Sequence, residues 1–277
     1  MWSPIKIWDS SSSTDGKEGS AAAQVIAVRV ISLAAALFWG VLFFGITDLL
    51  VVPDQDERFY EHYLLETGWG LLYTMLVMLP LVFLAVQPSW QVFPQQLTAV
   101  ALAVLLCGLF TPAAGQVFVA FLLAITVTVP SVLAERPLWP IRGLSVRGAN
   151  PWLSTLVLLA AAAAVVYAVQ MIEAANAGRP DDNTWGLMHL PMQAALGLAL
   201  AGSAAISVLA GASGASGWKL SVLPSSVSAV WLGAVSVAYP THLGSLGRSG
   251  GIAAIVWGLA FAAITLSSPR SRRAPAR

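Results

Sequence analysis

Three histidines are the side chains best suited to chemistry in this sequence: His62, His189 and His242. An imidazole with a carboxylate nearby is typical of metal and proton sites, and Glu66 and Asp182 lie close to two of them in the sequence. However, no pair of histidines has a metal-ligand spacing such as HxxxH or HExxH. A metal site therefore requires that folding bring the three together. Ordinary hydrogen bonding by separate histidines is the alternative.

His189 is the most informative of the three, because it lies in stretch 181–193, where an acidic loop leads into a long apolar segment. Helical steps of three and four residues put it on one face with Gln193, Leu196, Leu200, Ser203 and Ser207. This stripe could line a path for substrate or water, or could make hydrogen bonds between helices. Pro191 lacks an N–H, so we expect the helix to bend near its start and to leave the Leu187 carbonyl free.

Carboxylates occupy the expected outer ends of several helices, namely Asp48, Glu66 and Glu173. A carboxylate at a helix N-terminus is favoured by the helix dipole, and capping is a sufficient reason for Glu66. If two of the three instead meet beneath His189, they would form a binding site.

The elements that must position these groups are transmembrane helices. Of the 277 residues, 57% are hydrophobic and 10% are charged, whereas about a quarter are charged in a soluble domain. Apolar runs of about 17–25 residues, long enough to span a bilayer as a helix, recur along the chain. We expect eight spans: 25–47, 68–86, 94–110, 116–134, 152–172, 185–210, 220–239 and 251–266. The sequence therefore predicts an all-α, polytopic transmembrane helical bundle over residues 25–267.

Charge predicts the orientation of the bundle. If both termini are cytoplasmic, only three of the 14 Lys and Arg residues lie outside, namely Arg58, Arg179 and Arg248. The positive-inside rule therefore favours an N-in, C-in protein of the plasma membrane. Residues 1–24 are polar and Ser-rich, which predicts a disordered cytoplasmic tail, and residues 268–277 form a basic cytoplasmic tail. Most of the acidic residues then lie outside, and the outer mouth is acidic.

Several classes of function are disfavoured. The net charge of +1 argues against nucleic acid as a partner. No Asp, Glu, Lys or Arg lies in the middle of an expected span, although ion pumps generally need one there. The sequence has neither GxxxxGK nor GxSxG, which argues against ATP-driven machines and hydrolases of those kinds. The single cysteine, Cys107, cannot form an internal disulfide, and a buried thiol is expected.

Three functional hypotheses remain, and the sequence specifies no cofactor. The first is a permease-like or ligand-binding protein, with loops 53–67 and 175–184 forming the acidic mouth above a kinked sixth helix. Its candidate binding residues are His189, Gln193, Glu66, His62, His242 and Asp182. The second is a structural or assembly partner of other membrane proteins, which would use small-residue stripes such as Gly197-Ala201-Ala205. The third is a metal-dependent enzyme at the outer face, which requires the three histidines to converge. In each case the bilayer is a partner.

Overall fold

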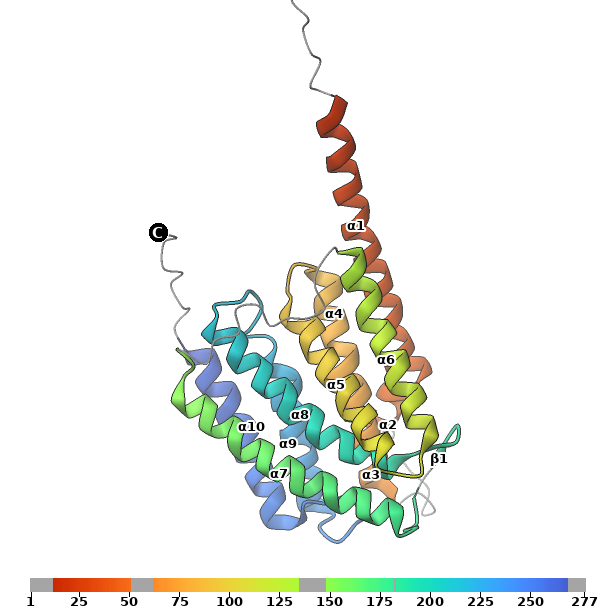
Figure 1. Cartoon of the computed structure of the whole chain (residues 1–277). Helices are drawn as coiled ribbons and strands as arrows, with labels where there is room; N and C mark the ends of the chain where they lie inside the picture. The colour runs from red at the N-terminus through yellow and green to blue at the C-terminus, as the bar shows by residue number, and fades with distance from the viewer. Residues whose placement is uncertain (1–11, 51–61, 135–147, 182, 269–277) are drawn as a thin grey trace, which may run out of the picture.

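A computed structural model describes residues 12–50, 62–134, 148–181 and 183–268. Almost all of the described chain is helical, and the helices pack as one bundle (Figure 1). The elements are α1 (Ser12–Leu37), η1 (Phe38–Leu42), α2 (Gly45–Leu50), α3 (Tyr63–Gly70), η4 (Leu71–Met78), α4 (Leu79–Val86), α5 (Val92–Leu109), α6 (Ala114–Leu133), α7 (Pro151–Asn176), β1 (Asn183–Thr184), β2 (Leu187–Met188), α8 (His189–Ala212), α9 (Val222–Ala238) and α10 (Gly247–Ser267).

Seven of the described helices are long and apolar enough to cross a membrane, and the 17-residue α9 is a shorter apolar helix. Large apolar side chains point outward, for example Phe118 on α6 and Leu158 on α7, each 70% exposed. Such outward faces suit lipid rather than water. The chain is therefore a multi-pass membrane protein, and the predicted all-α character is confirmed. The eighth crossing and the orientation of the termini stay predictions.

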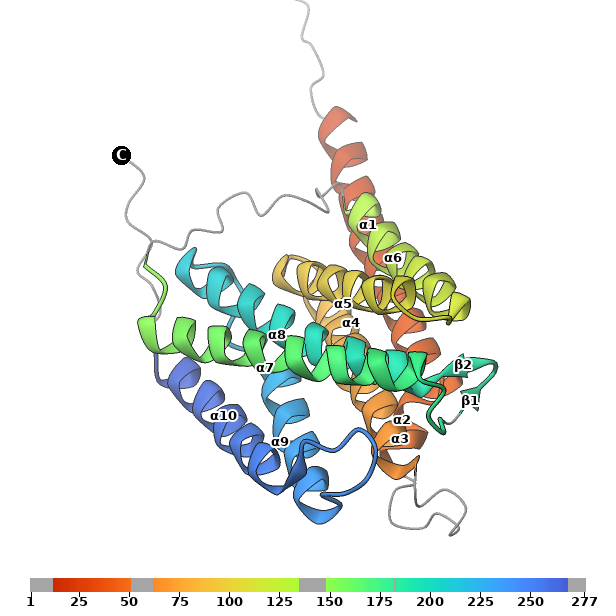
Figure 2. The same ribbon diagram turned by 60° about the horizontal axis from the view of Figure 1, so that its bottom comes forward.

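Two helical segments form the centre of the bundle. In segment 63–86, made of α3, η4 and α4, and in α8, 61% of the apolar window is buried, against 22% in α7 and α10. In Figure 2, α10 lies at the lower left and α1 and α6 lie at the upper right, while α7 runs across the front of α8. A stacked aromatic cluster fills the contact between η1 and the central segment, where the ring centroids of Trp39 and Tyr73 lie 5.4 Å apart and those of Phe43 and Trp69 lie 5.2 Å apart.

The N-terminal helix starts earlier than expected. Helix α1 begins at Ser12, so residues 12–24 are helical, in contrast to the disordered tail that we expected over 1–24. Adding residues to an existing helix costs far less than nucleating a new one, and Ala21, Ala22 and Ala23 are strong helix formers. Residues 1–11, most of the basic tail (269–277) and Arg136, Arg142 and Arg147 lie outside the described residues.

The first span ends sooner than expected, and this break is important for the site. Helix α1 passes into the π-helix η1, and Phe44 then adopts a left-handed conformation with φ of 63°. The carbonyl of Phe43 accepts a buried hydrogen bond from Nε1 of Trp69 at 2.9 Å, which stabilises the break. The expected continuous span 25–47 is therefore wrong beyond residue 42, and residues 45–50 form a separate short helix, α2.

A β-hairpin precedes α8. Strands β1 and β2 pair antiparallel around Trp185 and Gly186, whose φ values of 56° and 80° are those of a tight two-residue turn. Helix α8 consequently begins at His189 rather than at Trp185. Pro191 lies in its first turn, where a backbone N–H has no partner within the helix in any case. The predicted bend and free helical carbonyl at Leu187 are therefore wrong, because Leu187 belongs to β2.

Candidate functional site

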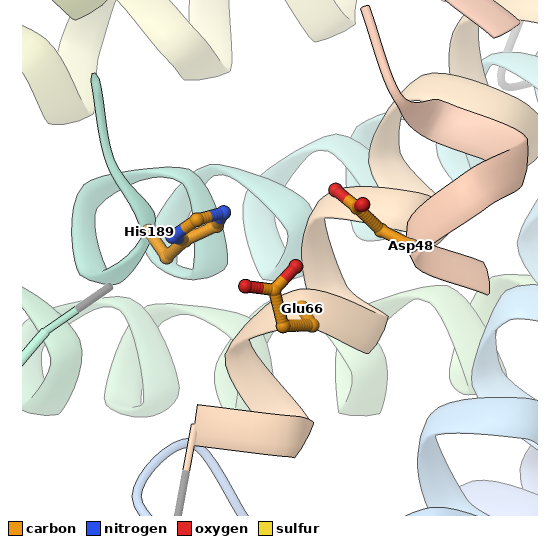
Figure 3. Close-up of side chains that lie close together, drawn as sticks. All are labelled: Asp48, Glu66 and His189. Carbon is orange, nitrogen blue, oxygen red and sulfur yellow. The ribbon is translucent and has the colours of Figure 1, made fainter. Parts of the chain in front are cut away.

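Three ionisable side chains meet at one end of the bundle: Asp48 of α2, Glu66 of α3 and His189 of α8 (Figure 3). One carboxylate oxygen from each acid and one ring nitrogen of the histidine all lie within 4.8 Å of one another. The side chains are buried, with exposed fractions of 8%, 6% and 0%. Within the described ranges, this is the one group of three or more His, Cys, Asp or Glu residues close enough to hold a metal ion.

Asp48 reaches the group because α2 lies directly on α3. The contact is made at Gly70, where a Cβ atom would lie 2.7 Å from the backbone nitrogen of Leu49, too close for any other residue. At Gly45, at the start of α2, a Cβ atom would lie 2.9 Å from the carbonyl oxygen of Trp39. The break after η1 and these two glycines therefore turn the chain back and place the carboxylate of Asp48 against α3.

Glu66 lies in the first turn of α3, as a capping residue would. Its carboxylate nevertheless points between Asp48 and His189 in Figure 3. The positive end of the helix dipole stabilises the negative charge at this position. Glu66 therefore has the helix position of a capping residue, but its side chain points toward Asp48 and His189.

His189 is the first residue of α8, and neighbours outside the carboxylate pair hold its ring. The indole of Trp69 packs against the imidazole edge to face, with ring centroids 4.7 Å apart. Oγ1 of Thr184, from β1, lies 3.4 Å from Nε2. The hairpin and the aromatic cluster together therefore set the orientation of the ring.

Gln193, one turn further along α8, belongs to a second polar layer. Its Nε2 donates to the Tyr167 hydroxyl at 2.6 Å, and that hydroxyl donates to the carbonyl of Gly244 at 2.6 Å. Its buried Oε1 has no hydrogen-bond partner among the described residues and lies against the backbone of Gly68, where a Cβ atom would overlap it. Gln193 therefore links α8, α7 and the loop before α10 beside the ionisable group.

The remaining candidates from the sequence lie elsewhere. His62 is the N-cap residue of α3, and His242 stacks on Tyr239 with ring centroids 5.1 Å apart. Neither belongs to the group that contains His189. Asp182 and residues 53–61 of the expected mouth lie outside the described residues. The neighbouring Asp181 accepts hydrogen bonds from the backbone nitrogen of Leu190 at 3.0 and 3.2 Å, which caps the start of α8.

The half of the predicted polar stripe that lies farther along α8 from His189 makes hydrogen bonds between helices. Nε2 of Gln96, on α5, donates to Oγ of Ser207 at 3.0 Å and to the carbonyl of Ser221 at 2.7 Å. Between this network and Gln193, the same face of α8 carries Leu196, which is fully buried, and Leu200. The stripe is therefore two polar layers separated by apolar packing.

Asp48 was not among the binding residues predicted from the sequence. From the sequence, two of Asp48, Glu66 and Glu173 were expected to form a binding site if they met beneath His189. The structure brings Asp48 and Glu66 to that position. Comparison of the chain with protein-family models, curated proteins and solved structures finds no match, so function is inferred from this geometry.

Proposed function

We propose that this membrane protein is permease-like or ligand-binding and takes a cation at Asp48, Glu66 and His189. The observation that carries the proposal is the convergence of two carboxylates and an imidazole, all buried, at the ends of two apolar spans. Ionisable residues within transmembrane segments are costly, and those that persist usually serve binding or transport.

The side chains around Asp48, Glu66 and His189 favour a cation rather than an anion. Carboxylate oxygens are acceptors and carry the charge that attracts cations. The indole of Trp69, which packs on His189, offers an aromatic surface beside the same group.

The proposal places the site at the outer face. Successive long helices alternate in direction, and the start of α1 and the end of α10 lie at the end of the bundle opposite to α2, α3 and the hairpin (Figure 1). The distribution of Lys and Arg favours cytoplasmic termini. The cation would then enter from outside, and the apolar layer at Leu196 would separate the site from the inner network at Gln96 and Ser207.

Binding and flux can be tested separately. Purified protein in lipid nanodiscs is exposed to alkali, divalent and organic ammonium cations, and thermal unfolding reports which of them bind. Liposomes that enclose a dye for each bound cation then report flux. We expect Glu66→Gln to abolish the stabilisation, whereas Glu173→Gln, which changes an exposed carboxylate at the end of α7, keeps it. The proposal fails if no cation stabilises the wild type or if Glu66→Gln responds equally.

A further inference from the structure

We infer that the bound cation is a divalent transition-metal ion, held by a ring nitrogen of His189 and by carboxylate oxygens of Asp48 and Glu66. This inference rests on the proposed function and specifies its ligand. The three ligands come from three different elements, α2, α3 and α8, and their side chains point into one common space in Figure 3.

The separation of the ligand atoms suits one small ion. Zinc is usually held tetrahedrally, and bonds of about 2.0–2.2 Å then place two ligand atoms about 3.3–3.6 Å apart. The three atoms lie within 4.8 Å of one another, so side-chain movements of about 1 Å or less bring them to that spacing. A quaternary ammonium group, whose charge is surrounded by methyl groups and which has no N–H donor, requires a wider ring of acceptors.

The kinds of ligand narrow the choice of metal. Mg²⁺ and Ca²⁺ prefer sites made of oxygen alone, whereas imidazole nitrogen suits Zn²⁺, Fe²⁺ and other transition metals. Soft ions such as Cu⁺ prefer thiolate or thioether sulfur, and the group contains neither. The group offers three protein ligands, one nitrogen and two carboxylates. Three is also the usual number at a metal site that leaves its fourth position open to water or a further ligand.

Neighbouring residues hold the proposed ligands in place, as the outer contacts of metal sites do. Trp69 packs on the imidazole ring and Thr184 contacts its Nε2. Gly70 lets α2 lie on the backbone of α3, which fixes the position of Asp48. The site is therefore supported by packing even before an ion enters.

Metal titration of the full chain in nanodiscs tests the inference. The protein is stripped with a chelator and titrated separately with Zn²⁺, Mn²⁺ and Fe²⁺, and bound metal is measured by mass spectrometry. We expect one ion per chain. We expect Glu66→Gln and His189→Gln each to weaken binding by more than about 100-fold, because loss of a direct ligand exceeds the roughly 10–100-fold effect of an outer contact. Glu173→Gln should bind as the wild type does.

X-ray absorption of the zinc-loaded wild type decides the ligands without any variant. The expected spectrum has nitrogen and oxygen neighbours at about 2.0–2.2 Å and no sulfur at about 2.3 Å. Absence of stoichiometric metal, a sulfur neighbour, or equal binding by folded Glu66→Gln would each overturn the inference. If a monovalent or organic cation stabilises the wild type but not Glu66→Gln, the proposed function stands and the metal assignment falls. If no cation binds, both fall.

Discussion

Glu66 and His189 face each other from the first turns of two different helices, α3 and α8. The positive ends of two helix dipoles thus point toward one buried place, and each favours nearby negative charge by about 0.3–1 kcal/mol. This arrangement offsets part of the cost of keeping the carboxylates of Asp48 and Glu66 out of water. It also explains why acidic side chains are tolerated at the ends of spans that are otherwise apolar.

The first prediction concerns the stability of the wild type. A ligand that binds only the folded state stabilises it by about 2.7 kcal/mol when present at 100 times its dissociation constant. We therefore expect the right cation to raise the thermal unfolding midpoint in a concentration-dependent way, and the increase to disappear in Asp48→Asn. Differential scanning calorimetry in nanodiscs measures both. An equal increase in Asp48→Asn would show that the ion binds somewhere else.

The second prediction separates the histidines. His189→Gln should abolish the stabilisation by cation, while His62→Gln and His242→Gln should retain it, because neither of those residues belongs to the ionisable group. The three variants change the same type of side chain, so they control for one another. Loss of binding in all three would restore the hypothesis that three histidines act together.

The third prediction tests how Asp48 is positioned. In Gly70→Ala, the new Cβ atom would lie 2.7 Å from the nitrogen of Leu49, which must push α2 away from α3. We expect cation affinity to fall at least about tenfold, because supporting contacts are worth roughly that much. Gly202→Ala is the control, since its Cβ would make an ordinary contact at 3.4 Å with Ala99. If Gly70→Ala and the wild type bind the cation with equal affinity, α2 is held in place by other contacts.

The fourth prediction concerns Gln193. In Gly68→Ala the added methyl group overlaps Oε1 of Gln193, so the amide must leave Tyr167 or the two helices must separate. Overpacking of this kind costs about 1–3 kcal/mol. Chemical denaturation should show that loss in Gly68→Ala, whereas Gly202→Ala should be neutral or slightly stabilised. A stability equal to that of the wild type would show that Gln193 can repack at no cost.

The length of the apolar runs was enough to predict a helical membrane bundle, and residue type together with helical spacing made His189, Gln193 and Glu66 candidates. What could not be predicted depends on contacts between distant parts of the chain. Residues 25–47 read as one span because the left-handed residue at the break is Phe44, a type that rarely adopts that conformation. Asp48 was therefore placed at a helix end rather than against α3. The convergence joins residues more than 100 positions apart, and no spacing rule reveals it.

The error at Pro191 has a local cause. Proline inside a helix predicts a bend, and the apolar run from Trp185 onward made Pro191 look internal. The sequence Asn183-Thr184-Trp185-Gly186 instead forms the hairpin, in which the Asn183 side chain accepts a hydrogen bond from the nitrogen of Gly186 at 2.6 Å. Asparagine and glycine near each other are a known turn signal, and here they shift the start of α8 to His189.

The small hairpin touches the site from two directions. Thr184 contacts His189, and the next residue, Trp185, rests on Phe44 at the break in the first span, with ring centroids 5.2 Å apart. The ring of Trp185 is 64% exposed. Through Thr184 and Phe44, the exposed indole of Trp185 is therefore connected both to the imidazole of His189 and to the segment that carries Asp48. A change at either the imidazole of His189 or the segment that carries Asp48 would therefore alter the surroundings of this indole.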